Sequence, residues 1–385
     1  MISKYTKIVA TISDKRCDVD FIKALYENGM NVVRMNSAHL DREGFKRIIN
    51  NVRAVSDKIG ILMDTKGPEI RTTATVGDEP LQFATGDRVL IAGLPDRLSE
   101  KERICVSYTR LAEDVEVGKH ILIDDGELDF LVLAKEEGAL LCESQNSGEL
   151  GSRKSVNVPG VRINLPSLTE RDKTNILYAI EEDIDFIAHS FVRNKQDVLD
   201  IQQILDEHNS PIKIISKIEN QEGVDNIDEI LEATYGVMVA RGDLGIEVAQ
   251  EYIPGIQARL IKKCIQAKKP VIVATQMLHS MIKNPRPTRA EVTDIANAIY
   301  NQTDAVMLSG ETAYGKYPVE AVATMARVAR EAERSKLFEN RIKVTGDDEQ
   351  DVTSFLARQA VKSFTKVGTR AIITDSYTGR TARYI

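Results

Sequence analysis

The sequence predicts an α/β fold: a (β/α)8 TIM barrel with an inserted small β-barrel domain and an incomplete C-terminal α/β domain. Short β-branched runs alternate with amphipathic stretches along most of the chain, which is typical of a parallel sheet covered by helices. After the third strand, about a hundred residues lose helical spacing and become rich in Gly, Pro and short alternating strands. We therefore expect a barrel domain at residues 1–66 and 165–340, an inserted β domain at 67–164 and the start of a C-terminal domain at 341–385.

The N-terminal segment reads as three strands separated by two helices. The strands are β-branched and too short to be helices, and the helices show apolar residues at helical spacing. Gly29 is suited to closing the first helix. In order, the strand, helix, strand, helix and strand are expected at residues 6–12, 18–29, 31–36, 41–58 and 59–64.

The same alternation returns after the insertion. Thr169 with Asp172 and Thr288 with Glu291 form capping-box patterns, which mark helix starts. Strands are expected at residues 185–191, 212–218, 236–240, 270–276 and 304–310, and helices at 169–182, 195–208, up to 233, 250–269, 288–301 and 318–335. The total is eight strand and helix units, the number that closes a barrel of this class.

The C-terminal segment changes character behind a polar linker, TGDDEQD. A helix at residues 352–366, a strand at 370–376 and the beginning of another helix at TGRTARYI are expected. One strand and one helix cannot bury their apolar faces. We therefore expect the natural protein to continue past Ile385.

Composition favours a soluble protein with a small-molecule partner. The net charge is -7 over 385 residues, with Lys and Arg interspersed among acids, which argues against a nucleic-acid or membrane footprint. The start MISKYTKIVA lacks an apolar signal core. The four cysteines are far apart and form no CxxC motif, which favours a reduced, cytoplasmic location; they are Cys17, Cys105, Cys142 and Cys264.

Polar residues gather where the predicted strands end, which is where barrel proteins carry their active residues. The insertion follows the third strand, so it is placed to close over this face as a lid. In chain order the strand ends carry Thr11 and Ser13, Arg34 and Asn36, Asp64, Thr65 and Lys66, Ser190, Lys217 and Glu219, Arg241 and Asp243, Thr275 and Gln276, and Ser309 and Glu311.

The stretch from residue 212 to 247 carries the chemistry of this face. Lys217 and Glu219 are two residues apart, as are Arg241 and Asp243, so each pair is expected to point to one side of its strand. Buried unpaired charges cost about several kcal/mol each. These charges must therefore be neutralised by one another, by a divalent cation on the carboxylates, or by an anionic substrate on the lysine.

Residue types at these positions suit phosphoryl chemistry. Glu219 and Asp243 offer hard oxygen ligands to Mg²⁺ or Mn²⁺. Lys217 and Arg34 would face the negative charge of a phosphoryl group. A turn beginning at Asp243 would aim backbone N–H groups at a carboxylate. A small substrate with both carboxylate and phosphate fits this set.

Structural roles are the alternative for each residue taken alone. A Lys-x-Glu pair is commonly a salt bridge, RGDLG commonly a turn, and Arg34 would then be a surface cation. Thr275 and Ser309 would cap helices. His39 and His189 are expected to be packing histidines. The coincidence of charged and amide groups at most strand ends favours a site.

Five motifs resemble those of pyruvate kinases: IISKIEN, MVARGDLGIE, VIVATQML, MDTKGPEIRT and RPTRAEVTDIANAIYNQTDAVMLSGETAYGKYP. The resemblance covers nearly the whole chain. It implies phosphoryl transfer from phosphoenolpyruvate to ADP, giving pyruvate and ATP in glycolysis, with Mg²⁺ (or Mn²⁺) and K⁺ as cofactors. It also implies a barrel domain, a lid domain, a C-terminal α/β domain and a homo-oligomer, a tetramer in the full-length protein.

The resemblance also assigns roles to individual residues. Lys217 would stabilise the phosphoryl group in transfer, and Arg34 would contact it. The substrate carboxylate would lie on Gly242, Asp243 and Thr275, with Thr275 and Ser309 near the enolate that is protonated. The nucleotide set is Arg34, Asn36, His39, Arg71 and Arg171, the Mg²⁺ ligands are Glu219 and Asp243, and the K⁺ ligands are Asn36, Asp64 and Thr65.

Three departures from the family pattern bear on these roles. The family reads Asn-Phe-Ser-His where this chain has Asn-Ser-Ala-His, and Ala38 has no oxygen for K⁺, while Ser37 is expected to point the other way. We therefore expect a weakened K⁺ site or one completed by water, although Glu69 resembles the potassium-requiring branch. Thr-Ile-Ser-Asp replaces Thr-Ile-Gly-Pro after the first strand, which affects the nucleotide-base contact. Arg171 stands where the family often has lysine.

Two other functions remain alternatives on the same barrel. One is a metal-dependent lyase or aldolase acting on pyruvate enolate, which would need no nucleotide. The other is an inactive remnant that binds phosphoenolpyruvate without turnover. For the chain as it stands, we expect a folded barrel with weakened assembly and no effector response.

Overall fold

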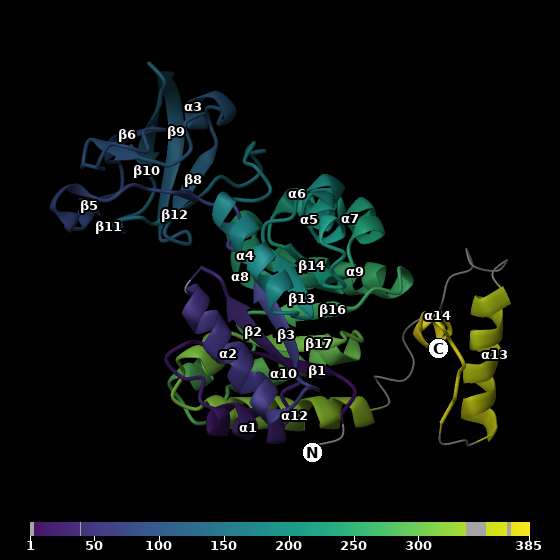
Figure 1. Ribbon diagram of the computed structural model, residues 1–385. Coiled ribbons are helices and arrows are strands. Elements are labelled where there is room, and N and C mark those ends of the chain that lie inside the picture. Colours follow the sequence, from purple (N-terminus) through teal and green to yellow (C-terminus); the bar gives the residue numbers. More distant parts are fainter. Residues whose placement is uncertain (1–3, 39, 336–351, 368–370) are drawn as a thin grey trace.

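Eight parallel strands close into a barrel in the computed structural model, which describes residues 4–38, 40–335, 352–367 and 371–385. Their order around the barrel is β1-β17-β16-β15-β14-β13-β3-β2. This confirms the predicted (β/α)8 barrel (Figure 1). The strands are β1 (Lys7–Thr11), β2 (Val32–Asn36), β3 (Gly60–Asp64), β13 (Phe186–His189), β14 (Lys213–Ile218), β15 (Gly236–Ala240), β16 (Val271–Ala274) and β17 (Ala305–Leu308).

Helices cover the outside of the barrel, each following its strand. They are α1 (Val19–Glu27), α2 (Arg42–Val55), α4 (Glu170–Glu181), α5 (Lys195–Glu207), α6 (Gln221–Asp225), α7 (Ile227–Ala233), α9 (Ile253–Gln266), α10 (Arg289–Tyr300) and α12 (Pro318–Arg334). Both predicted capping boxes form, at Thr169 with Asp172 and at Thr288 with Glu291. Gly29, with φ 116°, closes α1 as expected.

Three details of the helices differ from the predictions. The helix expected to end at residue 233 is divided into α6 and α7 at Asn226. The helix expected from residue 250 begins with a 3-10 turn, η2 (Gln250–Tyr252), and Pro254 then stands in the first turn of α9, where a missing N–H costs nothing. Short helices α8 (Arg241–Glu247), η3 (His279–Ile282) and α11 (Gly310–Ala313) follow β15, β16 and β17.

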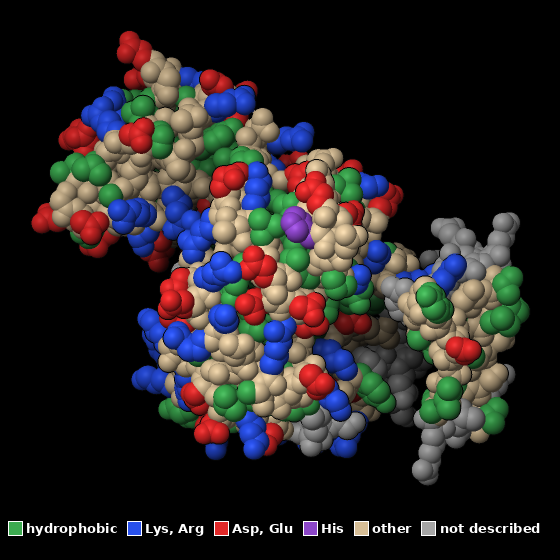
Figure 2. Space-filling model, viewed as in Figure 1, with side chains coloured by type: hydrophobic (Ala, Val, Ile, Leu, Met, Phe, Trp, Pro, Cys, Tyr) green, Lys and Arg blue, Asp and Glu red, His purple; other side chains and the backbone are tan. Residues whose placement is uncertain are grey.

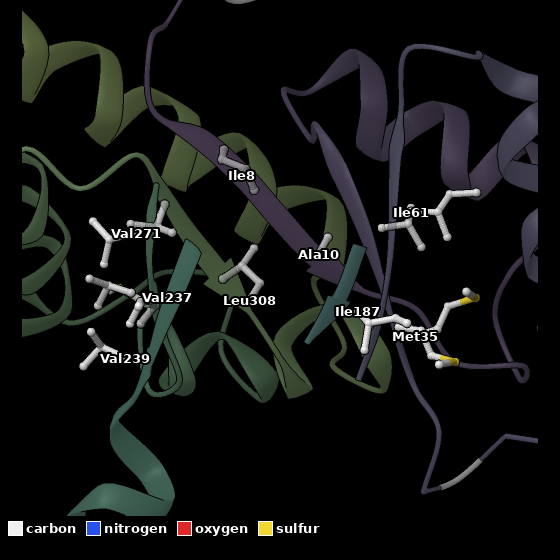
Figure 3. Close-up of a cluster of buried hydrophobic side chains, with 14 of the residues drawn as sticks. Ile8, Ala10, Met35, Ile61, Ile187, Val237, Val239, Val271 and Leu308 are labelled. Carbon is white, nitrogen blue, oxygen red and sulfur yellow. The ribbon is translucent and has the colours of Figure 1, made fainter. Parts of the chain in front are cut away.

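Apolar side chains alternate between two cores along the barrel strands. Ile8 and Ala10 of β1 face the surrounding helices, whereas Val9 faces the barrel interior. Figure 3 shows members of the outer core, among them Leu308 of β17 and Val237 of β15. Because both faces of each strand are buried, the strands read as continuous apolar runs in the sequence.

The insertion is a β domain with its own core. Its strands are β4 (Ile70–Arg71), β5 (Leu81–Phe83), β6 (Arg88–Ala92), β7 (Arg103–Cys105), β8 (His120–Ile123), β9 (Leu128–Glu136), β10 (Ala139–Ser144), β11 (Gly148–Leu150) and β12 (Ser155–Asn157), with η1 (Val76–Asp78) and α3 (Leu111–Asp114). Seven strands form one sheet in the order β4-β12-β8-β9-β10-β6-β7, and β11 pairs with β5. A bridge between Thr72 and Val106 brings the two ends of the sheet together, so the sheet curls round its core.

The C-terminal segment contains α13 (Val352–Val367) and α14 (Arg380–Tyr384), both where the sequence predicts helices. The strand expected at residues 370–376 does not form over residues 371–376, which are irregular. A strand needs a neighbour for its backbone hydrogen bonds, and no described strand pairs with this segment. The expected polar linker lies outside the described residues. Within the described part of the chain, no helix combines the length and apolar character needed to cross a membrane.

Candidate active site

The candidate site lies at the carboxyl ends of the barrel strands, next to the point where the chain leaves for the lid. Gly67, with φ 72°, begins this departure after β3. A Cβ on Gly67 would lie 2.8 Å from the Phe191 ring, so the close approach of the two loops requires glycine. The inserted β domain, which we call the lid, stands above this end of the barrel in Figure 1.

Four buried charged side chains meet at the centre of the site. Arg34 pairs with Asp64, and Lys217 Nζ lies 3.3 Å from Asp64 Oδ2 and 2.9 Å from Glu219 Oε1. All four residues are at most 9 % exposed. The sequence correctly placed Lys217 and Glu219 on one side, and Asp64 joins them to Arg34 from two strands away.

Ionisation in this cluster follows from burial and pairing. Burial opposes charge on Lys217, but Asp64 and Glu219 outweigh it and raise the pKa of the ammonium above its ordinary value. Burial likewise opposes charge on Asp64, yet Arg34 and Lys217 lower the pKa of its carboxyl. Glu219 behaves differently: burial, with the charge of Asp243, outweighs Lys217 and raises the pKa of Glu219 to about 7.

Ser190 supports the lysine. Lys217 Nζ donates to Ser190 Oγ at 2.8 Å, and Ser190 Oγ donates to the Thr65 carbonyl at 2.7 Å. The sequence marked Ser190 only as a strand-end residue without a role. Its position directly after β13, between two predicted site strands, was the available signal.

His189 is a buried packing residue, as predicted. Its Nδ1 lies 3.4 Å from Thr65 Oγ1. Burial lowers the pKa of His189 to about 4, only partly opposed by Asp197 and Asp172. The imidazole is therefore neutral at pH 7 and adds no charge behind the site.

The α8 helix and the loop after β16 form a second part of the site. The Gly242 N–H donates to Thr275 Oγ1 at 2.8 Å, which joins two of the residues predicted to hold a substrate carboxylate. Thr275 has φ 69° and Gln276 has φ 54°. This left-handed conformation is unusual for a β-branched residue, and such strain is concentrated at functional sites.

Arg241 fixes this strained loop through a hydrogen bond to its backbone and an ion pair with α10. Its Nη2 donates to the Thr275 carbonyl at 2.6 Å, and its Nη1 lies 2.7 Å from Asp294 Oδ2 on α10. The prediction that Arg241 and Asp243 point to one side is wrong, because residues 241–247 are helical and the two-residue strand period does not apply there. For the same reason the expected turn at Asp243 is a helix that begins at Arg241. Asp294 is not among the site residues that the sequence predicts.

Ser309 is placed by Glu311. The Ser309 N–H donates to Glu311 Oε2 at 2.8 Å, and Glu311 Oε1 accepts from the Leu278 N–H at 3.0 Å. The buried Glu311 carboxylate thus ties the loops after β16 and β17 together. No contact recorded among the described residues brings the Ser309 hydroxyl to Lys217.

The oxygens of Glu219 suit a divalent cation. Glu219 Oε2 accepts from the Phe191 N–H at 2.8 Å. Glu219 Oε1 is buried and forms an ion pair with the Lys217 ammonium at 2.9 Å, although the two atoms are not aligned as a hydrogen bond. No group of three or more His, Cys, Asp or Glu within the described ranges could hold a metal. Two carboxylates, from Glu219 and Asp243, match Mg²⁺, which usually takes one or two carboxylates together with substrate oxygens.

The predicted K⁺ ligands fit that ion only in part. Asp64 Oδ1 and Ser37 Oγ are buried without hydrogen-bond partners. Asn36 Oδ1, however, accepts from the Ala38 N–H at 3.0 Å, and the Thr65 carbonyl accepts from Ser190. One carboxylate oxygen of the predicted set is therefore free.

Arg71 and Arg171, two of the predicted nucleotide residues, lie outside the central cluster. Arg71 Nε donates to Glu69 at 2.6 Å, and its Nη1 donates to the Arg153 carbonyl at 2.8 Å. Arg171 donates to the Ser37 carbonyl at 2.9 Å. The placement of His39 lies outside the described residues.

A cavity of about 700 Å³ separates the lid from the barrel beside the cluster. It is bordered by residues of the inserted domain that include Arg71 and Asn157, and by barrel residues that include Asp243 and Glu247. In Figure 2, Lys and Arg side chains gather where the lid meets the barrel, among interspersed acids. The cavity is large enough for a small anionic molecule.

Comparisons with known proteins converge on one family. The family model "Pyruvate kinase, barrel domain" matches residues 3–322. A pyruvate kinase from Borreliella burgdorferi is 49% identical over 100% of this chain and 80% of its own length. A pyruvate kinase from Bacillus licheniformis is 47% identical over 99% of this chain and 66% of its own length.

A solved structure agrees with the sequence comparisons. The crystal structure of a pyruvate kinase from Cryptosporidium parvum is similar with a TM-score of 0.92 and 40% identity, over 99% of this chain and 80% of that one. This chain is thus shorter than these relatives, spanning 80% of two of them and 66% of the third.

Proposed function

The chain belongs to the pyruvate kinase family and is a phosphotransferase of that family; from this premise we propose that it transfers the phosphoryl group of phosphoenolpyruvate to ADP, giving pyruvate and ATP. We also propose the domain limits expected from the sequence, with a barrel at residues 1–66 and 165–340, a lid at 67–164 and a C-terminal segment at 341–385. The two separate hydrophobic cores support the first two.

The buried charge cluster carries the proposal. Lys217 remains an ammonium at neutral pH because Asp64 and Glu219 offset its burial. Held by Ser190, the ammonium faces the phosphoryl group in transfer, and Arg34, fixed by Asp64, adds a second positive charge. Preorganised charge in a dry site stabilises developing negative charge without reorganisation.

Substrate and product are held by α8 and the strained loop. The substrate carboxylate is assigned to the N–H groups of Gly242 and Asp243 and to the Thr275 hydroxyl. The Gly242 N–H donates to Thr275 Oγ1, which itself donates to the Ala274 carbonyl, so a bound carboxylate would take the place of these two hydrogen bonds. Thr275 and Ser309 lie on the loops after neighbouring strands β16 and β17, where the enolate takes up its proton. Backbone and hydroxyl groups orient the substrate but carry no net charge that would hold pyruvate too tightly.

The cations are assigned to oxygen-bearing side chains at the carboxyl ends of the barrel strands and in the segments that follow them. Glu219 and Asp243 hold Mg²⁺ or Mn²⁺, and Asn36, Asp64 and Thr65 hold K⁺, with Ala38 leaving the K⁺ set short of one oxygen. When bound, the divalent ion neutralises charge on the phosphoryl oxygens. The buried Glu219 Oε1, which has no aligned hydrogen-bond donor, supports this assignment.

ADP is assigned to the space between the lid and the barrel. Arg34, Asn36, His39, Arg71 and Arg171 are the proposed nucleotide contacts. Arg71 comes from a lid strand and borders the cavity that Asp243 also borders, so lid and barrel approach one bound molecule from two sides. We also propose self-association into a homo-oligomer, which light scattering would measure.

A coupled assay tests the proposed function. Purified protein with phosphoenolpyruvate, ADP, Mg²⁺ and K⁺ should produce pyruvate, followed as lactate dehydrogenase oxidises NADH. Omission of ADP should abolish the signal. Turnover without ADP would favour the lyase or aldolase chemistry, and calorimetric binding of phosphoenolpyruvate without turnover would favour an inactive binding protein.

A further inference from the structure

The lid is anchored to the barrel at the point where the chain returns from it. Arg193, which follows β13, donates through Nη1 to the carbonyls of Ile163 and Leu165 at 3.1 and 2.8 Å. The same guanidinium is held by Asp197 at 3.0 Å. The returning segment is therefore fixed to the barrel, and movement of the lid must take place beyond it.

Beyond this anchor, two side-chain pairs among the described residues join the lid to the barrel: Arg162 with Glu222, and Asn157 with Glu247. Asn157 Nδ2 donates to Glu247 Oε1 at 3.3 Å, across the junction between β12 and the end of α8. A cavity of about 700 Å³ and a second of about 390 Å³ both border Glu247, and each has lid residues on its other side. The lid is thus loosely seated here, and the Asn157–Glu247 contact lies between the two spaces.

This contact joins two parts of the proposed site. Glu247 is the last residue of α8, the helix that also carries Gly242 and Asp243. Asn157 ends β12, and β12 pairs with β4 so that Ser155 stands opposite Arg71. One hydrogen bond therefore links the helix assigned to substrate and Mg²⁺ with the strand pair assigned to ADP.

We propose that Glu247 is a positioning residue, which accepts a hydrogen bond from Asn157 and thereby sets the lid strands that carry Arg71 relative to the helix that carries Asp243. The effect on catalysis rests on the proposed function, whereas the effect on the lid does not. Burial raises the pKa of Glu247, and the Asn157 amide only partly offsets this. The Glu247 carboxylate is half-buried between the two cavities, and its hydrogen bond from Asn157 is long. A closer approach of the Asn157 amide strengthens this bond, which favours closure of the lid.

Exchange of donor and acceptor tests the proposal. Glu247→Ala removes the acceptor, and Asn157→Asp places a second carboxylate opposite Glu247. The double variant Asn157→Asp with Glu247→Gln rebuilds the hydrogen bond with its direction reversed. Arg88→Gln is the control, because Arg88 pairs with Glu143 within the lid at 3.8 Å, its side chain is 66% exposed, and it does not border the cavity assigned to ADP.

Two measurements read the outcome on the whole chain. Glu247→Ala and Asn157→Asp should each raise the KM for ADP about five-fold or more, with a smaller change in kcat, as expected for loss of one charged hydrogen bond. The double variant should restore most of the affinity for ADP, and the control variant should keep the KM for ADP of the unsubstituted protein. Labels at Leu98→Cys on the lid and Lys262→Cys on α9 should report a broader distance distribution in the two single variants, and the four buried native cysteines should not react.

The label distances keep this proposal separate from the proposed function. If the unsubstituted protein shows no turnover, the proposed function fails, and the distance distributions alone decide the role of Glu247. Unaltered distances and KM in folded single variants would overturn the proposal. Failure of the double variant to restore either quantity, at an unchanged melting temperature, would also overturn it.

Discussion

The Lys217 ammonium contacts three buried side chains, Asp64, Glu219 and Ser190. Lys217→Met should lower kcat by about a thousand-fold, because it removes a preorganised positive charge facing the phosphoryl group. Lys213→Met is the control, since Lys213 is exposed at the start of the same strand. The coupled assay measures both. Full activity in Lys217→Met would refute the assigned role.

Glu219 should make stability depend on pH when no divalent cation is present. Its pKa is raised from 4.5 to about 7 in the folded protein. Between these values the folded state holds a proton that the unfolded state has released, so stability falls as pH rises from about 4.5 to about 7 and is level above. The loss in the free energy of unfolding amounts to about 3 kcal/mol.

Comparison with Glu219→Gln isolates this contribution. Denaturant unfolding of both proteins in chelator should show the unsubstituted chain losing stability relative to the variant as pH rises through that interval. Mg²⁺ added at pH 8 should restore the unsubstituted chain selectively, because binding to the folded state stabilises it. Parallel curves for the two proteins would show that the Glu219 carboxyl does not titrate there.

Ala38 should weaken activation by K⁺. Ala38→Ser supplies the missing hydroxyl as one more oxygen ligand for K⁺. If that ligand contributes roughly 1 kcal/mol, as a hydrogen bond does, the K⁺ concentration for half activity should fall several-fold. Ser37→Ala is the companion variant, because Ser37 Oγ is buried and has no partner. An unchanged potassium curve in Ala38→Ser would show that the site is built differently.

At the scale of elements, α8 depends on an ion pair with another helix. Arg241 reaches Asp294 on α10 and the carbonyl of Thr275. Asp294→Asn should lower the unfolding free energy by about 1–3 kcal/mol and raise the KM for phosphoenolpyruvate, because the arginine then holds the strained loop less firmly. Asp228→Asn is the control, because Asp228 pairs with Lys263 but its own side chain is 75% exposed. Equal effects of the two variants would contradict a specific role for Asp294.

The elements that local chemistry specifies were predictable from the sequence. Buried strands, both capping boxes and the closing Gly29 depend on neighbouring residues only, and all of them form. The helical state of residues 241–247 was not predictable, because a strand period continued from β15 places Arg241 and Asp243 together. The expected strand at 370–376 failed for a related reason, since pairing depends on a neighbour that local sequence does not reveal.

The site shows the same division. Lys217 and Glu219 follow from one motif, and their position on one side of the strand was predicted. The bridge from Lys217 through Asp64 to Arg34 joins three strands, and the Asp294 contact with Arg241 joins residues 53 positions apart. Such contacts depend on how the barrel closes, which residue spacing alone does not fix.

At the scale of the molecule, lid and barrel have separate cores, so they should unfold as separate units. Phe130 is fully buried in the lid core, and Phe45 is 1 % exposed in the barrel core. Substitution of either phenylalanine by alanine should lower the free energy of unfolding of its domain by about 3–5 kcal/mol. If the cores are independent, each loss should fall on its own domain.

Hydrogen exchange read by mass spectrometry separates the two outcomes. In Phe130→Ala, peptides from β8, β9 and β10 should exchange faster while those from β1, β14 and β17 keep their protection, and Phe45→Ala should do the reverse around α2. The Phe130→Ala barrel should still bind phosphoenolpyruvate with Mg²⁺, because Lys217, Glu219, Asp243 and Thr275 all belong to it, but it should lose affinity for ADP together with the lid-borne Arg71. Uniformly faster exchange across both domains would mean that the two domains unfold together. The lid would then be held by more than the contacts around Arg193 and Glu247.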